Sequence, residues 1–582
     1  MSKRYDNLRI NIFLIFVFLL SGLVLYRLFI LSIVRHSAYS RTAQAQNESI
    51  SNILARGSIY LSDKDSNLTL AATNKKFPLV YAVPADIEDS KRDEISVELA
   101  KLLGVETLAI KEKIDSSSNN MKVIARRLET GQVEAIKSLK FKGIGISYEM
   151  DRLYPGGNLA ANVIGFLGYD AEGKRAGQYG VEAYYDQDLF GHEPNMAGIF
   201  SEVDPFGIKK IFSGVLGDKT DNPPKKYSFD KPADIALTID KNVQVFAETK
   251  LKELVSRWQA DNGTVIIQEP DTGRILAMVD WPDFNPNLYS STEPKYFLNS
   301  SVNEVYEPGS SFKPITMSAG IDLSKVTPQT TYTDSGVMEI SGYSIRNFDN
   351  KAHGVQTMSQ VLEHSLNTGA MFVENLVGDD NFLNYVINNG FGQKTGVDLP
   401  GEVNGDVTNL YSGRKINYLT ASFGQGIAVT PLQMVNAYSA IANGGKLMRP
   451  YVVEKIIKEG GEEIVTKPEI VGIPISEKTA VKIQSMLISV VDNGFDKARI
   501  KGYDIAGKTG TAQIPDGTGG YSSTEFIHNF VGFAPAYDAK FVILVKMERP
   551  KGIAFAADSL SPTFKEIAGF LLNYYNIPPT RK

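Results

Sequence analysis

Two residues near the middle of the chain could form a catalytic pair. Ser310 and Lys313 follow the turn Glu307-Pro308-Gly309 at the start of an apolar stretch that predicts a helix. Residues three apart share one face of a helix, so we expect the hydroxyl and the amine to lie side by side. A serine hydroxyl needs a nearby base, and a lysine serves when burial and neighbouring charges lower its pKa. The pair predicts nucleophilic catalysis near a helix N-terminus, which favours developing negative charge.

The Ser-x-x-Lys spacing alone is weak evidence, because the two residue types often fall three apart on a surface helix. Two later motifs strengthen it: a Ser-Leu-Asn at Ser365 to Asn367, and a Lys-Thr-Gly that begins at Lys508. The order S-x-x-K, S-x-N, K-T-G is shared by penicillin-binding proteins and active-site serine β-lactamases. The three motifs together predict an acyl-transfer site.

The predicted catalytic residues are Ser310, Lys313, Ser365, Asn367 and Lys508. Ser365 is expected to relay a proton between Lys313, the leaving group and Lys508. Asn367 offers an amide donor and acceptor to the substrate backbone. Lys508 is expected to supply a fixed positive charge.

The predicted substrate-binding residues are Thr509, Gly510 and Thr511. With Lys508, the two threonine hydroxyls are expected to hold the carboxylate of a peptide C-terminus or of a penicillin. The backbone N–H groups of Ser310 and Thr511 are expected to form the oxyanion hole. This chemistry requires no cofactor and no metal ion.

An antiparallel sheet is predicted to position these motifs. Residues 264–268 and 275–280 predict two strands joined by a Pro-Asp-Thr-Gly turn. Residues 527–534 and 541–547 predict a second strand pair, and helical stretches lie between the two pairs. The C-terminal part, residues 231–582, is therefore expected to be an α+β domain with helices covering an antiparallel sheet.

The preceding region, residues 35–230, is expected to be a non-catalytic module. Short apolar strands alternate with Gly, Pro and Asn turns, and only residues 93–103 suggest a helix. No catalytic cluster occurs in it. A polar, lysine-containing stretch with two prolines, residues 218–232, indicates a linker. We therefore place the domain boundary near residue 230.

An apolar run near the N-terminus predicts one membrane span. Residues 10–34 carry one charge, Arg27, which lies near one end and can reach the headgroups. Lys3, Arg4 and Arg9 precede the run, which predicts a cytoplasmic tail over residues 1–9 and an external chain beyond the span. A signal peptide cleaved near Ala43 is the alternative, but the run is longer than signal peptides need.

Composition excludes several classes of protein. The 582 residues have a net charge of −5, with 61 basic and 66 acidic residues spread along the chain. Because there is no basic stripe, nucleic acid is not an expected partner. The chain has no cysteine, which excludes thiolate nucleophiles and suits an extracytoplasmic location.

The chain resembles class B penicillin-binding proteins over nearly its whole length. The resemblance is carried by these segments: Arg56-Gly57-Ser58-Ile59, Arg152-Leu153-Tyr154-Pro155, Gly180-Val181-Glu182, Leu237-Thr238-Ile239-Asp240, Thr272-Gly273-Arg274-Ile275-Leu276-Ala277, Pro308-Gly309-Ser310-Ser311-Phe312-Lys313-Pro314, Gly424-Gln425-Gly426, Thr430-Pro431-Leu432-Gln433 and Gly507-Lys508-Thr509-Gly510-Thr511-Ala512-Gln513. Residues 60–63 depart from the family, which often has an aspartate, an arginine and an asparagine there.

The resemblance implies a peptidoglycan D,D-transpeptidase. Its expected architecture is a cytoplasmic tail, one span of the cytoplasmic membrane, an elongated, β-rich pedestal or dimerisation module, and a transpeptidase domain similar to the serine β-lactamases. Expected ligands are stem peptides ending in D-Ala-D-Ala and β-lactams. Expected protein partners are a polytopic membrane glycan polymerase and proteins of division or elongation. The compact pedestal favours division.

Other interpretations fit parts of the sequence. A β-lactam sensor or β-lactamase shares the three motifs, and a division scaffold without activity could retain the fold. Residues 502–509 also fit the P-loop pattern G-x-x-x-x-G-K-T, but the glycines and proline that follow argue against the helix a P-loop opens. A Ser-His-Asp hydrolase would need a G-x-S-x-G motif and a zinc protease an H-E-x-x-H motif, and neither occurs.

Overall fold

The computed structural model describes residues 56–115, 121–190, 231–340, 342–494, 496–517 and 520–581, together with residues 14, 16–18, 21 and 22. The predicted cytoplasmic tail, most of the predicted span and the linker up to residue 230 lie outside the described residues. Within the described residues, none of the helices combines the length and the apolar character that a membrane crossing requires. The single-pass anchor stays a prediction.

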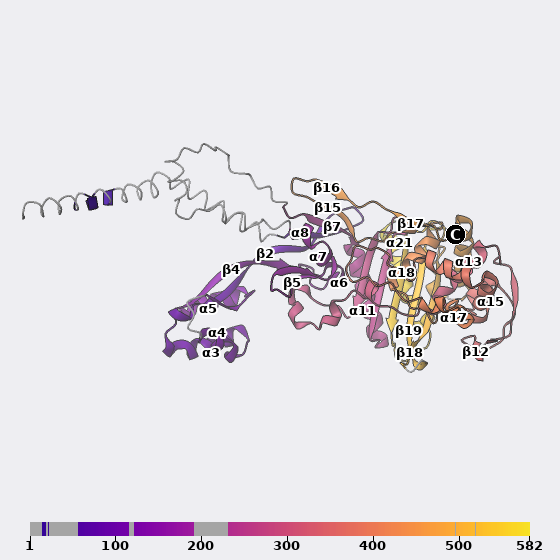
Figure 1. The fold of residues 1–582 in the computed structure, drawn as a ribbon, viewed down its shortest axis with the longest axis horizontal. Coiled ribbons are helices and arrows are strands. Elements are labelled where there is room, and N and C mark those ends of the chain that lie inside the picture. The colour runs from indigo at the N-terminus through magenta and orange to yellow at the C-terminus, as the bar shows by residue number, and fades with distance from the viewer. Residues whose placement is uncertain are drawn as a thin grey trace, which may run out of the picture.

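The N-terminal part forms an elongated lobe at one end of the molecule (Figure 1). Strand β2 (Thr69–Ala82) pairs antiparallel with the whole of β4 (Ile144–Leu153). At the far end of this ladder lie α3 (Arg92–Leu103), α4 (Thr107–Ile114) and α5 (Thr130–Leu139). Their apolar sides and β2 share one small core. The predicted helix over residues 93–103 is confirmed as α3.

The expectation of a single helix in this lobe is wrong. Besides α3, α4 and α5, the described residues include α6 (Ala161–Ile164), α7 (Gly180–Tyr184) and α8 (Asp186–Phe190). Their sequence signal was weak because the helices are short, and α4 and α5 bury only two residues each. The other strands of the lobe are β1 (Ile59–Ser62), β3 (Lys122–Ala125), β5 (Phe166–Tyr169) and β6 (Arg175–Gln178).

A buried ion cluster joins three segments of this lobe. Glu182 on α7 is fully buried, and its two carboxylate oxygens accept from Arg56 Nε at 2.5 Å and Arg152 Nε at 2.7 Å. Tyr154 donates its hydroxyl to the same carboxylate at 3.1 Å. The resemblance segments of the N-terminal module therefore meet at one carboxylate.

A seven-stranded mixed sheet links the two halves of the chain, in the order β16-β15-β7-β1-β2-β3 with β4 also paired to β2. Strands β7 (Asp234–Asp240), β15 (Val453–Ile457) and β16 (Glu463–Val465) follow the predicted boundary, whereas β1 to β4 precede it. Strands β1 and β7 run parallel. The boundary near residue 230 stays a prediction, but the parts on either side of it share a sheet.

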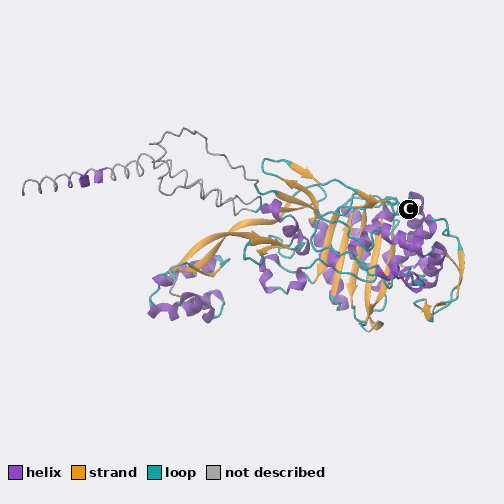
Figure 2. Cartoon of the chain, viewed as in Figure 1, coloured by secondary structure: helices purple, strands orange, loops and turns teal. Residues whose placement is uncertain are grey.

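The C-terminal part is built on a five-stranded antiparallel sheet in the order β18-β19-β20-β8-β9 (Figure 2). Strands β8 (Asn262–Gln268) and β9 (Ile275–Trp281) form the first predicted hairpin. Strands β19 (Tyr521–Ala534) and β20 (Phe541–Glu548) form the second. Strand β18 (Ala506–Pro515) adds an edge beside β19. Both predicted strand pairs are confirmed.

Helices cover both faces of this sheet. Val265 and Ile267 of β8 belong to a core shared with α11 (Lys241–Trp258) and α21 (Ser561–Tyr574). Ile266 belongs to the core on the other face, with α13 (Lys313–Asp322), α18 (Pro431–Ala442) and α19 (Glu477–Ser489). This alternation along β8 is the pattern of a strand buried on both faces.

Smaller elements complete the C-terminal part. The helices are α12 (Ser300–Asn303), α14 (Met358–Glu363), α15 (Asn367–Val377), α16 (Asp379–Asn388), α17 (Lys415–Ala421) and α20 (Ala556–Ser559). Three two-stranded sheets pair β10 (Thr331–Asp334) with β13 (Gly354–Thr357), β11 (Val337–Ile340) with β12 (Tyr343–Arg346), and β14 (Leu447–Met448) with β17 (Ile470–Gly472).

Candidate active site

Ser310 lies in a short 3₁₀ helix, Gly309–Phe312, that runs directly into α13. The sequence predicted the serine near a helix N-terminus, and the structure places it in the turn just before α13. Gly309 has φ of +59°, and a Cβ there would lie 3.2 Å from the Thr511 carbonyl oxygen. Glycine therefore allows this turn to approach β18. Ser310 itself is half-buried, so it remains open to a substrate.

The two motif lysines meet at Ser365. Lys313 Nζ donates to the Ser365 carbonyl oxygen at 2.5 Å and lies 3.3 Å from Ser365 Oγ. Lys508 Nζ lies 3.0 Å from the same Oγ and 3.2 Å from the Thr509 carbonyl oxygen. Ser365 has φ of +56°, a left-handed conformation that a non-glycine residue adopts at a cost. The fold therefore brings one residue from each motif to a single hydroxyl.

Both lysines are enclosed: Lys313 is 1% exposed and Lys508 0%. Burial, and then the charge of Lys508, hold the pKa of Lys313 well below its usual value. Burial also lowers the pKa of Lys508 to about 7. The neutral amine favoured at Lys313 is the form that accepts a proton. The charge of Lys508, predicted to be fixed, depends on pH near neutrality.

Asn367, the first residue of α15, is held in place by two residues that lie outside the three motifs. Asn347 Oδ1 accepts from the backbone N–H groups of Asn367 at 2.9 Å and Thr368 at 3.3 Å. Asn347 Nδ2 and Thr368 Oγ1 donate in turn to Asp334 at 2.9 and 2.7 Å. Burial raises the pKa of Asp334, but hydrogen bonds such as that from Thr368 outweigh it and keep the pKa below its usual value. The Asn367 amide donates to the Arg346 carbonyl oxygen at 2.9 Å.

Sequence reasoning missed Asn347 and Asp334. Both precede the Ser-x-N motif by many residues, and neither lies in a segment whose spacing suggests a site. An aspartate or asparagine in a turn-rich stretch ordinarily indicates a turn. Only the tertiary contact shows that they orient Asn367.

Strand β18 lies against the serine turn. A Cβ on Gly510 would lie 2.4 Å from the Pro308 carbonyl oxygen, so only glycine fits there. Asn529 of β19 donates to that same carbonyl at 3.0 Å. Thr511 Oγ1 accepts from the Ala556 backbone N–H at 3.2 Å, which leaves its own hydrogen available to a ligand. Because β18 is a strand rather than a helix, the P-loop interpretation of residues 502–509 is wrong.

Not every predicted contact is formed. Within the part of the chain that the structure describes, Ser310 Oγ makes no hydrogen bond, because Lys313 Nζ is directed to Ser365 instead. Catalytic hydrogen bonds are often long or absent until substrate binds. The structure thus brings together Lys313, Ser365 and Lys508, with Ser310 one helical turn from Lys313.

Two family models match this chain, and together they cover most of it. Residues 263–569 match the penicillin binding protein transpeptidase domain. Residues 54–196 match the penicillin-binding protein dimerisation domain. The chain belongs to the class B penicillin-binding proteins. As a member of that family it is a penicillin-binding transpeptidase of the serine type, and the N-terminal lobe corresponds to the dimerisation domain.

This penicillin-binding protein has relatives along most of its length. It is 33% identical over 527 residues to Stage V sporulation protein D of Bacillus subtilis, covering 89% of this chain and 78% of that protein. It is 27% identical to the probable peptidoglycan D,D-transpeptidase PenA of Neisseria gonorrhoeae, covering 89% and 84%. The apo structure of penicillin binding protein 3 from Mycobacterium tuberculosis is 28% identical, with a TM-score of 0.64 over 74% of this chain and 92% of that chain.

Proposed function

We propose that this penicillin-binding protein is a peptidoglycan D,D-transpeptidase that joins stem peptides through an acyl intermediate on Ser310. The observation that carries the proposal is the position of Ser365 Oγ, 3.3 Å from Lys313 Nζ and 3.0 Å from Lys508 Nζ. This arrangement supplies a proton acceptor and a proton relay beside a half-buried serine. The donor is a stem peptide ending in D-Ala-D-Ala.

In the acylation step, neutral Lys313 accepts the proton of Ser310 as Oγ attacks the carbonyl carbon of the penultimate D-Ala. The backbone N–H groups of Ser310 and Thr511 stabilise the negative charge that develops on the carbonyl oxygen. The peptide bond to the last D-Ala then breaks. The proton passes from Lys313 through Ser365 to the departing amine, so free D-Ala leaves with the proton that Ser310 lost.

In the second step, the amine of another stem peptide attacks the Ser310 ester. A new peptide bond forms, Ser310 is released, and the proton that the amine loses returns to Ser310 through Lys313. A penicillin acylates Ser310 in the same way, but its amine stays tethered to the acyl group after the β-lactam ring opens. The tethered group blocks the acceptor amine, which explains a long-lived ester.

Substrate binding is assigned to β18 and to Asn367. The part of β18 beside the serine turn holds the terminal carboxylate of the donor peptide. It consists of Lys508, Thr509, Gly510 and Thr511. Binding of that carboxylate favours protonated Lys508, because an opposite charge nearby raises the pKa of a lysine. Asn367 releases the Arg346 carbonyl to pair with the peptide backbone of the substrate.

We also infer the cellular setting. One N-terminal span, residues 10–34, would anchor the chain in the cytoplasmic membrane with the catalytic domain outside, beside a polytopic glycan polymerase and proteins of division or elongation. The small N-terminal lobe favours septal synthesis over elongation of the side wall. Depletion in cells separates these roles: filaments support septal synthesis, whereas rounded or swollen cells indicate elongation.

Fluorescent penicillin tests the chemistry. Purified protein is labelled, digested, and the modified peptide mapped by mass spectrometry, with Ser310→Ala as the matched variant. We expect one stable label on Ser310, and release of D-Ala from a stem-peptide substrate only in the unsubstituted protein. Label on another serine would overturn the assignment. Rapid hydrolysis of penicillin would indicate a β-lactamase, and rescue of growth by Ser310→Ala would indicate a scaffold.

A further inference from the structure

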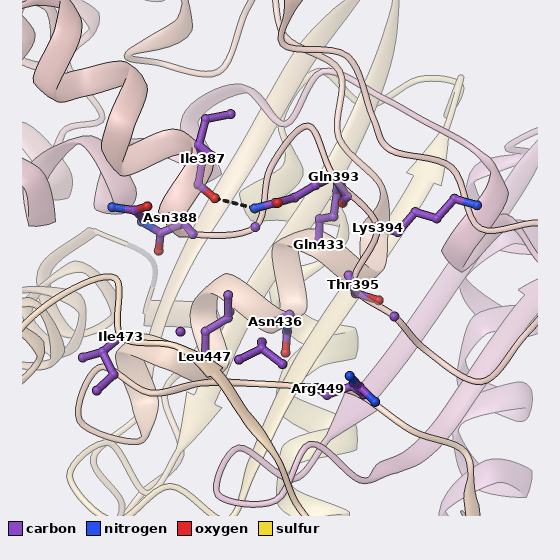
Figure 3. A pocket seen from close by; sticks show the side chains of 15 residues that line it. Ile387, Asn388, Gln393, Lys394, Thr395, Gln433, Asn436, Leu447, Arg449 and Ile473 are labelled. Carbon is purple, nitrogen blue, oxygen red and sulfur yellow. Dashed lines mark hydrogen bonds between the residues drawn. The ribbon is translucent and has the colours of Figure 1, made fainter.

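A cavity of about 620 Å³ lies between the end of α16, helix α18 and the β14–β17 pair (Figure 3). Its volume falls within the range of small-molecule sites, roughly 300–1,000 Å³. None of the eight predicted catalytic and substrate-binding residues lines it. The cavity is therefore separate from the transpeptidase site.

Two buried amide side chains present unpaired atoms in this cavity. Asn436 on α18 is 3% exposed, and its Oδ1 accepts from Gln268 at 3.1 Å. Asn389, just after α16, is 2% exposed, and its Nδ2 donates to the Tyr385 carbonyl at 2.8 Å. Within the described part of the chain, Asn436 Nδ2 and Asn389 Oδ1 have no hydrogen-bond partner. A side-chain donor and an acceptor that line one cavity match the C=O and N–H of a ligand amide.

The rim of the cavity is positive. Lys394 is exposed and forms no ion pair among the described residues. Arg449 pairs with Glu469 at 3.1 Å at the surface, where both side chains are about half exposed. No acidic residue lines the cavity. Lys394 has no ion pair among the described residues, and the exposed pair of Arg449 with Glu469 is weak, so the two cations favour a negatively charged group on the ligand.

Part of the remaining wall is apolar and open, and Asn388, Gln393, Thr395 and Gln433 also line the cavity. Leu447 of β14 is buried at the base of the cavity, whereas Val471 of β17 and Ile473 are exposed along its edge. Figure 3 shows Leu447, Asn436 and Arg449 among the side chains that line the cavity. An apolar wall beside an amide-binding pair suits a small aliphatic side chain.

From these features we propose that the cavity is a second binding site, which takes an N-acylated peptide with a free terminal carboxylate. The ligand amide pairs with Asn436 Nδ2 and Asn389 Oδ1, its carboxylate lies between Lys394 and Arg449, and its aliphatic side chain packs on Leu447. An acidic sugar with an acetamido group carries the same amide and carboxylate. The peptide is favoured because Leu447, Val471 and Ile473 give its aliphatic side chain an apolar surface.

The test uses full-length protein whose Ser310 has been acylated with penicillin, and the same protein before acylation. N-acetyl-alanyl-alanine, its C-terminal amide and N-acetylmuramic acid are titrated separately, and binding is followed by ligand-detected NMR. We expect saturable binding of N-acetyl-alanyl-alanine that persists after acylation. The C-terminal amide, which lacks the carboxylate, should bind about 1.4- to 5-fold more weakly, the factor that corresponds to the roughly 0.2–1 kcal/mol of an exposed ion pair.

Two charge reversals locate the site. Lys394→Glu should weaken binding of N-acetyl-alanyl-alanine by roughly three- to tenfold, because it turns a rim attraction into a repulsion. Lys446→Glu is the matched control: Lys446 is exposed and nearby but does not line the cavity, so binding should stay unchanged. Both lysines are exposed, so neither variant should disturb folding.

Three results would overturn the proposal. Equal binding of the acid and its amide would show that the ligand carboxylate makes no favourable contact with the site. Equal effects of the two charge reversals, or binding that disappears once Ser310 is acylated, would place the ligand elsewhere. Binding of N-acetylmuramic acid without binding of the peptide would show that the occupant is an acidic amino sugar.

Discussion

Substitution of each of the two buried lysines by arginine distinguishes a lysine that acts as a base from one that supplies a positive charge. A guanidinium is not deprotonated in a protein, so Lys313→Arg keeps a positive charge and removes the proton acceptor. General-base catalysis is worth about 10²- to 10⁴-fold, so acylation of Ser310 should slow by at least that factor. In barrier height this is about 3–5 kcal/mol. Lys508→Arg keeps a cation that can hold a carboxylate, and should slow acylation less.

The structure makes the two substitutions comparable. Lys313 is 1% exposed and Lys508 0%, and each Nζ reaches Ser365 Oγ. Forcing a larger side chain into a packed interior typically costs about 1–3 kcal/mol. Because that cost falls on both variants, the ratio of their acylation rates reports the chemical difference between the two sites. The expected ratio is about 10²- to 10⁴-fold.

The pH dependence gives a second readout. The pKa of Lys508 is about 7, so above neutrality it loses its proton and its hold on a carboxylate. Acylation of the unsubstituted protein should therefore fall as pH rises above about 7. Lys508→Arg should not show this fall, because arginine stays charged.

The assay is the second-order rate constant for acylation by a chromogenic β-lactam, measured on folded proteins of matched thermal stability. Equal losses in the two variants, or a milder loss for Lys313→Arg, would show that Lys313 is not the base. Persistence of the alkaline fall in Lys508→Arg would show that another group causes it.

Three further predictions concern stability and topology. Lys508→Met should raise the thermal unfolding midpoint at pH 7 and abolish acylation. Between about pH 7 and 10 the unfolded chain holds a proton on Lys508 that the folded protein lacks, so the stability of the unsubstituted protein rises with pH. The stability gained by methionine should therefore shrink as pH rises, which calorimetry across this range would show. Glu182→Gln leaves buried Arg152 without a carboxylate and Arg56 with Asp186 alone, so denaturant unfolding should report a loss of about 3–5 kcal/mol. Glu172→Gln on the exposed surface should change little, and equal effects would contradict a structural role for the cluster. Protease added to intact spheroplasts should digest the chain beyond residue 35 and spare the first nine residues, whereas a released, soluble protein would favour a cleaved signal peptide.

Local patterns identified much of the C-terminal part. The alternation and turn residues of the two hairpins predicted the strands that form the core sheet, because strand period and turn chemistry are properties of adjacent residues. The three motifs predicted the candidate catalytic residues for the same reason. The sequence pattern did not predict helices α4 and α5, because each buries only two residues and its other, more polar residues resemble a loop.

Other features depend on residues far apart in the chain. The parallel pairing of β1 with β7 joins two segments separated by the whole N-terminal lobe, and no local pattern encodes that register. The contacts of Asp334 and Asn347 with the Asn367 segment are of the same kind. Such contacts depend on the fold as a whole.

The sequence by itself determined the residue types and the order of the candidate active site: a serine, two lysines, a second serine and an asparagine in three motifs. Their electrostatic state was decided by the tertiary structure. Lys313 and Lys508 lose their water only when the sheet and helices close around them, and desolvation is what lowers the pKa of each. A motif specifies which groups are present, whereas burial, which the whole fold produces, decides whether an amine is a base or a cation.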